Sequence, residues 1–400
     1  MIMKNINRKI IRWTPLAGVA ACLIPVVTQV HEKPNVVIIL ADDMGYGDVS
    51  SFNPLARTQT PHIDRLASQG LNFRDAHAGG AVSIPSRYGL LTGQYFFRAP
   101  AKDSYWGYLP PLIDNGRETI GSVMQKAGYT TACVGKWHLG VEWQRKDPSQ
   151  PQILNRQTLG YTNTDFSKPV LNGPNEMGFD YSFILPASLD MPPYVFLRNG
   201  QVIDPDIVLT ADLYPTALER TVYAWDRKHA RNEEDIYWDR GVWWRNGEMS
   251  RSFKVEDCLD HIVNEGISFI ENHVAGQPDK PFMLYLPLTG PHTPWMPNDD
   301  FKGTSAMGTY GDFIGQIDDV VARVNRVLSR LGIEENTIVI FASDNGSAWE
   351  EEDTQLYGHA SSGPWRGQKG DAWEGGHRVP FIVKWPAQIR GGKRMTIRLA

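Results

Sequence analysis

The sequence predicts an α/β fold with a large, mostly parallel central sheet flanked by helices. Near-continuous apolar runs of strand length are typical of strands that are buried on both faces of such a sheet. Between these runs the apolar residues recur with helical spacing, and strands that alternate with helices indicate a doubly wound sheet. In sheets of this kind, ligands bind beyond the carboxyl ends of the strands. The strand-like runs are residues 35–40, 129–135, 282–286 and 337–341, and the helical patterns are residues 60–70, 119–127 and 314–331.

The three helical patterns have recognisable start and stop signals. Pro61 lies in the first turn of the first pattern, where a missing N–H breaks no helical hydrogen bond, and Gly70 follows its last turn. Gly128 and Gly332 follow the last apolar positions of the second and third patterns. Glycine is the usual residue just after a helix because it adopts the left-handed backbone conformation without strain.

The composition excludes several classes of protein. Of the 400 residues, 42% are hydrophobic and 21% are charged, so the chain is neither a disordered tail nor a fibre. Lys and Arg number 40 against 45 Asp and Glu, which gives a formal charge of −5. This balance gives no reason to expect a nucleic-acid partner. No segment of the mature chain reaches the roughly 18 apolar residues that span a bilayer.

Residues 1–29 have the pattern of an export signal. Four basic residues come before or at the start of the apolar stretch 13–27, and a positive start followed by a short apolar core is typical of a secretory signal. Two processing routes stay open: cleavage near Val30, or a lipoprotein signal in which Cys22 is lipidated. Both routes place the protein in the periplasm or at the cell surface, and only a lipid anchor would attach it to a membrane.

The two cysteines of the mature chain, Cys133 and Cys258, do not form a disulfide framework. They allow one bridge at most. Cys133 lies in an apolar, strand-like run, which favours a buried thiol. A different kind of sequence occupies residues 141–250, which are rich in Pro, Asn, Asp and aromatic residues and have weak periodicity. We expect these residues to form a loop-rich insertion over the sheet rather than a separate domain.

Paired oxygen-bearing side chains follow two of the predicted strands. Asp42 and Asp43 end the first strand, and Asp344 and Asn345 end the last. Each pair alone could cap a following turn. Two pairs at equivalent ends of neighbouring strands instead predict a metal site, and a set of oxygen ligands favours a hard cation, Ca²⁺ or Mg²⁺.

A small nucleophile begins a further predicted helix. Ser83 precedes Pro85 by two residues, and Arg87 follows one turn later. The backbone N–H groups at a helix start attract an anion, although Ser-x-Pro-Ser is also an ordinary N-cap sequence.

Four more groups lie at predicted strand ends or on nearby loops: Lys136, His138, His292 and Lys369. Any one of them alone could be a surface or core residue. Together with Arg87, these cations and imidazoles suit a tetrahedral oxyanion substrate.

These motifs together resemble a type I sulfatase of the alkaline-phosphatase-like superfamily. The resemblance runs from about Asn35 to Pro386, and its motifs come in the family's order. It implies that residues 30–400 are the sulfatase catalytic domain, and that the family's small C-terminal antiparallel subdomain is not in this chain. The motifs that carry it are LADDMGYGD ending at Asp48, SIPSR from Ser83, GKWHLG around Lys136 and His138, GPH ending at His292, SDNG around Asp344, and Lys369.

The resemblance implies that Ser83 is oxidised to formylglycine (3-oxoalanine), whose hydrated form is the nucleophile. Ser83 matches the serine-type signature, which a radical-SAM maturase modifies in a transient encounter. A second reading stays open, in which the natural residue is Cys and Ser83 replaces it. The implied ligands of Ca²⁺, preferred here over Mg²⁺, are Asp42, Asp43, Asp344, Asn345 and residue 83.

The remaining catalytic roles also come from the resemblance. Arg87 would hold residue 83, Lys136 and Lys369 would bind sulfate oxygens, His292 would protonate the leaving oxygen, and His138 would take a proton from the second hydroxyl.

The expected substrate is a sulfated carbohydrate, such as a glycosaminoglycan. Export and the aromatic insertion favour a sugar that stacks on Trp or Tyr, and Asp190 and Arg198 are candidate contacts to it. Trp106, Trp243 and Trp295 are candidate stacking platforms that could equally be packing residues. The alternatives are an arylsulfatase, a phosphonate or phosphate monoester hydrolase of the same superfamily, and a non-catalytic sulfoglycan binder if Ser83 stays unmodified.

Overall fold

The structure is a computed structural model that describes residues 33–99, 106–154, 160–213 and 246–396. The predicted signal over residues 1–29, with Cys22, lies outside the described residues. Residues from Lys33 onward form one compact unit. Within the described ranges, no helix is both long enough and apolar enough to cross a membrane.

A ten-stranded sheet forms the centre of this unit, in the order β12-β2-β11-β10-β1-β9-β3-β4-β5-β6. Its five central strands, from β10 to β4, are parallel, and antiparallel strands flank them on both sides. The predicted α/β class with a mostly parallel sheet is confirmed. The strands are β1 (Asn35–Ala41), β2 (Leu71–Phe73), β3 (Thr130–Lys136), β4 (Tyr181–Leu185), β5 (Leu197–Arg198), β6 (Gln201–Val202), β9 (Phe282–Pro287), β10 (Thr337–Ser343), β11 (Phe381–Lys384) and β12 (Lys393–Met395).

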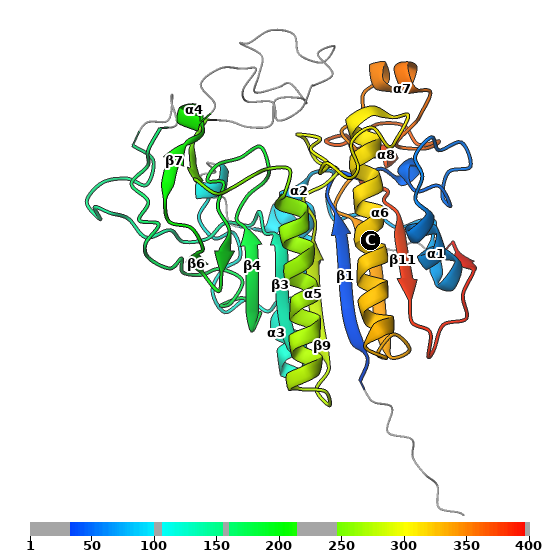
Figure 1. The fold of residues 1–400 in the computed structure, drawn as a ribbon, viewed down its shortest axis with the longest axis horizontal. Coiled ribbons are helices and arrows are strands. Elements are labelled where there is room, and N and C mark those ends of the chain that lie inside the picture. The colour runs from blue at the N-terminus through cyan, green and yellow to red at the C-terminus, as the bar shows by residue number, and fades with distance from the viewer. Residues whose placement is uncertain (1–32, 100–105, 155–159, 214–245, 397–400) are drawn as a thin grey trace, which may run out of the picture. The chain divides into compact units, whose positions relative to one another are not determined.

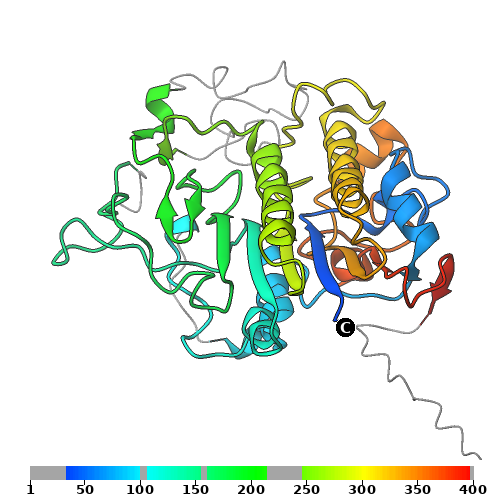
Figure 2. The ribbon, with the colours of Figure 1, turned by 60° about the horizontal axis from the view of Figure 1, so that its bottom comes forward.

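Helices cover both faces of the sheet, which explains why its central strands are apolar throughout. Val37 and Ile39 of β1 pack into a core with α1, α5 and α6. Ile38 and Leu40 point the other way, into a core with α2 and α3. Successive side chains of a strand alternate between faces, so a strand covered on both sides needs an unbroken apolar run. In Figure 1, α5 and α6 lie in front of the sheet, and α2 and α3 lie behind it. Figure 2 shows the same ribbon turned about the horizontal axis.

The predicted helices are present with shifted ends. The third pattern begins earlier than expected, since α6 starts at Gly308 rather than near residue 314. Gly332 follows it with φ of +71°, the left-handed conformation that its position predicted. The helices are α1 (Pro61–Gln69), α2 (Ser83–Thr92), α3 (Ile120–Lys126), α4 (Thr210–Leu213), α5 (Cys258–Gly276), α6 (Gly308–Arg330), α7 (Glu351–Tyr357) and α8 (Glu374–His377), with 3-10 turns η1 (Tyr46–Asp48), η2 (Phe96–Arg98) and η3 (Trp106–Tyr108).

Part of the region 141–250 belongs to the sheet itself. Strand β4 is buried and parallel to β3, and β5 and β6 extend the sheet beyond it. The expectation that all of this region lies over the sheet is therefore wrong for residues 181–202. A five-residue strand between polar loops gives too short an apolar signal to be recognised. Strands β7 (Ile207–Leu209) and β8 (Glu248–Ser250) form a separate two-stranded sheet.

Both cysteines of the described residues are buried free thiols. The expectation of a buried thiol at Cys133 is confirmed, and the bridge between Cys133 and Cys258 that the count allowed is absent.

Candidate functional site

The polar residues that follow the central strands meet at one edge of the sheet. Strands β10, β1, β9 and β3 are adjacent and parallel, so their carboxyl ends lie side by side. The residues that these ends carry are Asp344 and Asn345 after β10, Asp42 and Asp43 after β1, His292 on the loop after β9, and Lys136 and His138 at the end of β3. The bonds described below show that this convergence is close.

Three of the four predicted metal-site residues are hydrogen-bonded to one another, and the fourth, Asp42, directly precedes Asp43 in the chain. The N–H of Asp43 donates to Oδ1 of Asp344 at 3.1 Å, and Nδ2 of Asn345 donates to Oδ1 of Asp43 at 2.7 Å. None of the four side chains is accessible to solvent in any appreciable degree. Asp43 has φ of +64°, an uncommon conformation for a residue other than glycine. Backbone strain of this kind is held where the surroundings fix it, often at functional sites.

Ser83 begins helix α2 and points into this group of acids. Its Oγ donates to Oδ1 of Asp42 at 3.1 Å and lies 3.4 Å from Oδ1 of Asn345. The side chain is buried, with 4% of the residue exposed. The helix therefore presents its first side-chain oxygen to the ends of β1 and β10.

Arg87 lies one turn further along α2 and is fully buried beneath Ser83. Its Nε and Nη2 both donate to Oδ2 of Asp344, at 3.0 and 2.8 Å, and its Nη1 donates to the carbonyl of Lys136. Burial alone would lower the pKa of Arg87, but Asp344 and then Asp42 outweigh it and raise that pKa. Arg87 thus ties α2 to β10 and β3 as a permanent cation.

Two lysines balance the remaining acids. Nζ of Lys136 donates to Oδ2 of Asp42 at 2.5 Å, and Nζ of Lys369 donates to Oδ2 of Asp43 at 2.5 Å. Burial raises the pKa of Asp42, but the cations beside it, Lys136 foremost, outweigh burial and lower it. Burial lowers the pKa of Lys369, but the carboxylates of Asp43 and Asp42 outweigh burial, and the pKa of Lys369 is raised. With Arg87 and Asp344, three cations face three carboxylates.

The two histidines of the site differ in their surroundings. Burial, followed by the neighbouring cations, holds the pKa of His138 well below its usual value of 6.5, so its ring is neutral. Among the described residues, Nδ1 of His138 has no hydrogen-bond partner although it is buried. His292 donates from Nδ1 to the carbonyl of Thr293 at 2.5 Å, which turns its Nε2 toward Oδ2 of Asp43, 3.7 Å away.

The structure brings one of the two candidate sugar contacts to the site. Oδ1 of Asp190 lies 4.0 Å from Nδ1 of His292, so Asp190 borders the cluster. Arg198 lies on β5, where its guanidinium donates to Glu265 at 2.8 Å and to the hydroxyl of Tyr181. Those partners lie on α5 and β4, and the structure does not bring Arg198 into the cluster.

Of the three candidate stacking tryptophans, Trp295 is a core residue. It is 3% exposed and packs against Tyr310 and Trp349, so the platform interpretation is wrong for it. The side chain of Trp106 and the whole of Trp243 lie outside the described residues.

Sequence reasoning missed the polar network that holds the loop after β1. The carboxylate of Asp48 accepts hydrogen bonds from the N–H of Gly45, from Tyr310, and from Ser361. Nε2 of His359 lies 2.8 Å from its other oxygen. All of these side chains are buried. Asp48 lies in the same motif as Asp42 and Asp43, and this position was the only signal in the sequence that could have identified it. No sequence pattern linked Asp48 to hydrogen-bond partners more than 250 residues away.

The donor chemistry of the cluster fits a hard divalent cation. Asp42, Asp43 and His292 carry possible ligand atoms within 4.8 Å of one another. Asn345 adds an amide oxygen beside Asp43, and Asp344 adds a third carboxylate. Carboxylate and amide oxygens are the ligands that Ca²⁺ and Mg²⁺ prefer. These carboxylates are already buried and held by cations, so the residues present fit the predicted ion.

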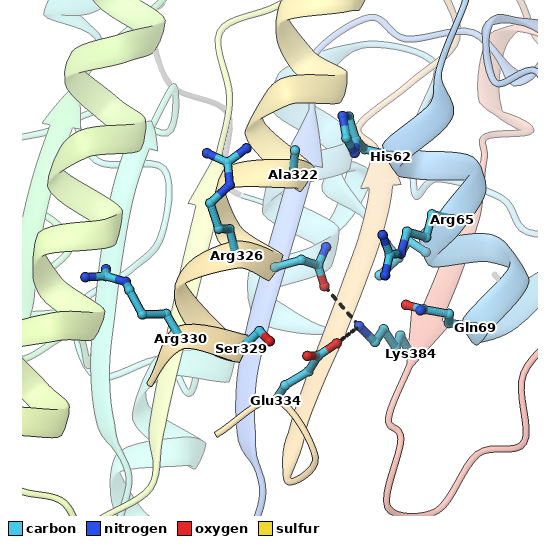
Figure 3. A pocket seen from close by; sticks show the side chains of 11 residues that line it. His62, Arg65, Gln69, Ala322, Arg326, Ser329, Arg330, Glu334 and Lys384 are labelled. Atoms are coloured by element: carbon cyan, nitrogen blue, oxygen red, sulfur yellow. Dashed lines mark hydrogen bonds and ion pairs between the residues drawn. The ribbon is translucent and has the colours of Figure 1, made fainter. Parts of the chain in front are cut away.

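A separate pocket lies between α1, α6 and β11, and it holds none of these residues. Its cavity is about 490 Å³, and its lining includes four cationic side chains, those of Arg65, Arg326, Arg330 and Lys384. Figure 3 shows Lys384 paired with Glu334 across the pocket. Lys384 ends an antiparallel strand, so this pocket is near the opposite edge of the sheet from the carboxyl ends of the parallel strands.

Comparison with known proteins gives consistent matches. The family profile described as Sulfatase matches residues 34–398. An N-acetylgalactosamine-6-O-sulfatase of Bacteroides thetaiotaomicron is 36% identical over 99% of this chain and 76% of its own length. An arylsulfatase of Hemicentrotus pulcherrimus is 31% identical over 90% of this chain, which spans 55% of that relative's length.

A solved structure supports the same relationship. It comes from work on the metabolism of multiple glycosaminoglycans by Bacteroides thetaiotaomicron and is 35% identical to this chain. The two superpose with a TM-score of 0.74 over 91% of this chain and 74% of the other.

Proposed function

The chain belongs to the sulfatase family of sulfuric ester hydrolases, and from this we propose that it removes sulfate from a sulfated carbohydrate of the glycosaminoglycan type. The observation that carries the proposal is the direction of Ser83. Its oxygen meets Asp42 and Asn345, with the ammonium of Lys136 on the same carboxylate. A nucleophile among cations and metal-type oxygens suits attack on an anionic ester.

We propose that Ser83 is matured to formylglycine by a radical-SAM enzyme and acts as the hydrated aldehyde. A geminal diol offers two hydroxyl groups on one carbon. One can attack sulfur, and the other can later expel the product, which a plain serine cannot do. Arg87 is fully buried one turn further along α2 and donates to Asp344 at the end of β10. This bond would hold the start of α2, and with it residue 83, in place.

We propose that Asp42, Asp43, Asp344 and Asn345 hold Ca²⁺, in preference to Mg²⁺, with residue 83 beside them. When bound, the ion neutralises charge on the sulfate group and lowers the pKa of the hydroxyl next to it. Lys136 and Lys369 then bind sulfate oxygens, because both ammonium groups already lie at this cluster.

We propose that each of the two histidines carries one proton transfer of the reaction. A hydroxyl group of residue 83 gives its proton to the Asp42 carboxylate, which already accepts a hydrogen bond from Oγ of Ser83. Its oxygen then bonds to sulfur, the ester S–O bond breaks, and His292 gives a proton to the leaving oxygen from Nε2. His138 then takes a proton from the second hydroxyl, the bond from residue 83 to sulfate breaks, and the aldehyde returns. Water adds to the aldehyde and restores the geminal diol for the next turnover. The neutral ring of His138 and its unpartnered Nδ1 support its role as the base. Each acid–base step contributes about 10²- to 10⁴-fold.

We propose that the sugar lies against Asp190, which borders His292 and can accept hydrogen bonds from hydroxyl groups. The names of the relatives make a 6-sulfated N-acetylgalactosamine the first compound to test. Arg198 is not carried into this part of the proposal because its guanidinium is bonded to Glu265.

The test is a panel of position-defined sugar sulfates, an aryl sulfate and a matched phosphate ester, assayed with matured protein. Intact mass must first show the loss of about two daltons at residue 83 that serine oxidation gives. We expect turnover of a 6-sulfated amino sugar to exceed that of the other positions and of the phosphate. No turnover of any sulfate by protein with the oxidised residue would contradict the proposal.

His292→Ala separates the proton donor from a merely structural residue. We expect it to lose most turnover on a sugar sulfate, whose leaving alkoxide needs a proton, and less on an activated aryl sulfate. Equal losses on the two substrates would contradict the role given to His292.

A second candidate function is arylsulfatase activity, which the likeness to the Hemicentrotus pulcherrimus enzyme favours. Preference for the aryl ester in the same panel, by kcat/KM, would select it. If residue 83 is found as serine, a non-catalytic sulfoglycan binder becomes the better description.

We also propose that the protein is exported, because residues 1–29 have the pattern of a secretory signal. Fractionation of expressing cells tests this, with periplasmic or surface recovery expected.

A further inference from the structure

A second cluster of possible metal ligands lies outside the acidic site, where two distant parts of the chain run side by side. His77 lies on the segment between β2 and α2, and Glu374 and His377 form part of α8. His77 forms an antiparallel bridge with Arg378, and the N–H of Ala78 donates to the carbonyl of His377 at 2.7 Å. The backbone therefore fixes the two histidines opposite each other.

The hydrogen bonds of the two rings determine where their protons lie. Nε2 of His77 is 2.8 Å from Oδ1 of Asp75, and Nε2 of His377 is 3.3 Å from the carbonyl of Ala372. An ionised carboxylate and a carbonyl can only accept, so both Nε2 atoms carry hydrogen. A neutral ring then has a bare lone pair on Nδ1, and the two Nδ1 atoms are 2.9 Å apart.

Two bare lone pairs at that distance repel, and a cation held between them would remove the repulsion. It is either a proton, which makes one ring an imidazolium, or a metal ion. The carboxylate of Glu374 favours a metal ion, because it offers a third ligand atom within 4.8 Å of both rings. Two imidazoles and one carboxylate are a recurrent zinc ligand set, completed by water.

The geometry is close to that of a bound ion. Zinc–nitrogen bonds of about 2.0–2.1 Å at a tetrahedral angle separate two nitrogens by about 3.3–3.4 Å, so the 2.9 Å found here must widen by a few tenths of an ångström. The acceptors on the far nitrogens, Asp75 and the Ala372 carbonyl, are the outer partners that usually orient metal-binding histidines.

We propose that His77, His377 and Glu374 bind a borderline transition-metal ion such as Zn²⁺, at a site separate from the oxygen-rich acidic cluster. Nitrogen donors favour such ions, whereas oxygen-only sets favour Ca²⁺ or Mg²⁺. Arg378 donates to Oε2 of Glu374 and to Oδ1 of Asp75, and these two carboxylates balance the positive charge of its guanidinium. A carboxylate has two oxygens, so Glu374 can bind an ion through the other one.

The ion would join the two segments that lead into the acidic site. His77 precedes Ser83 by six residues, and the loop with Lys369 ends at α8. These segments also meet at the N–H of Gly370, which donates to the carbonyl of Ala81 at 2.8 Å. A bound ion therefore stabilises the positions of both the nucleophile segment and the Lys369 loop, without touching substrate.

The test is a Co²⁺ titration of the full chain kept saturated with Ca²⁺, followed by visible absorption, with Zn²⁺ binding measured by calorimetry. We expect one equivalent of Co²⁺ with the intense bands of four-coordinate ligation. His77→Asn and His377→Asn should each weaken binding at least tenfold, and Asp75→Asn, which removes an outer partner, about 10- to 100-fold. His62→Asn is the matched control, since His62 is an exposed histidine on α1, and it should bind as the parent does.

Glu374→Gln keeps both imidazoles and serves if a histidine variant fails to fold; it should weaken binding and lose the four-coordinate spectrum. Zn²⁺ should also raise the melting temperature of the parent and of His62→Asn, but not of Glu374→Gln. Unchanged Co²⁺ affinity in the histidine variants, or no binding by the parent at millimolar Co²⁺, would overturn the proposal and leave a shared proton as the cation between the rings.

Discussion

Replacing Arg87 by methionine tests the electrostatic account of the site. The guanidinium is fully buried, donates twice to Asp344 and once to the Lys136 carbonyl, and lies 3.3 Å from Asp42. Methionine fills a similar volume without charge. The substitution leaves Asp344 and Asp42 buried with less positive charge near them, and breaking a buried ion pair in this way costs about 3–5 kcal/mol. Since domains are stable by about 5–15 kcal/mol, the loss is a large share of the total.

The measurement is urea unfolding, followed by far-UV circular dichroism, with and without Ca²⁺. We expect the midpoint of Arg87→Met to fall strongly without Ca²⁺ and to recover partly with it, because a bound cation supplies the missing charge and binds only the folded chain. Arg251→Met is the matched control: its pair with Asp206 is solvent-exposed, so its midpoint should not change measurably. A midpoint for Arg87→Met that equals the control's would refute the reasoning.

Three further predictions concern the frame of the fold. Burial raises the pKa of Asp318 to about 6 from 3.8, so the contribution of Asp318 to stability is fully present below pH 3.8 and is lost as the pH rises through 6. Asp318→Asn should flatten this part of a stability–pH curve, and an unaltered slope would count against it. Burial also raises the pKa of both thiols, so peptide mapping after iodoacetamide at pH 8 should find Cys133 and Cys258 unlabelled until the chain unfolds. Gly135→Ala should destabilise the fold by about 2–3 kcal/mol or more, because φ of Gly135 is +135° and a β-carbon there would lie 1.9 Å from a carbonyl oxygen of β9. The control is Gly332→Ala, where φ is +71° but the space around the residue is open, and it should cost only about 1–2 kcal/mol in denaturant melts. Equal losses in the two variants would show that the contact at Gly135 is unimportant.

The sequence contained strong signals for the sheet centre and for the residues at its edge. Strands β1, β9 and β10 are unbroken apolar runs because helices cover both of their faces, and Asp42 or Asp344 follows where such a run stops. Parallel strands bring these stops together, so a pattern local to each strand was enough to predict a shared site.

Other features depend on contacts that no local pattern encodes. Strand β4 is short and lies among polar loops, and its place is set by pairing with β3. The partners of Asp48 come from α6 and from the loop after α7, far along the chain. Trp295 was ambiguous because an aromatic side chain suits a core and a sugar platform equally, and only packing against Tyr310 decided it. Arg198 gave no sign in the sequence that Glu265 would bind it.

Lys136 donates to Asp42, and Lys369 donates to Asp43. These bonds couple the affinity of the site for a divalent ion to its affinity for a sulfated substrate. An ammonium group has three N–H donors, but its single positive charge is shared when a carboxylate and a substrate oxygen both contact it. A divalent ion that took over those carboxylates, as proposed above, would free both lysines to bind an incoming sulfate. By thermodynamic reciprocity, the factor by which such an ion would tighten substrate binding is also the factor by which substrate would tighten binding of the ion. At a low concentration of the ion the substrate would bind weakly, and at a low concentration of the substrate the ion would bind weakly.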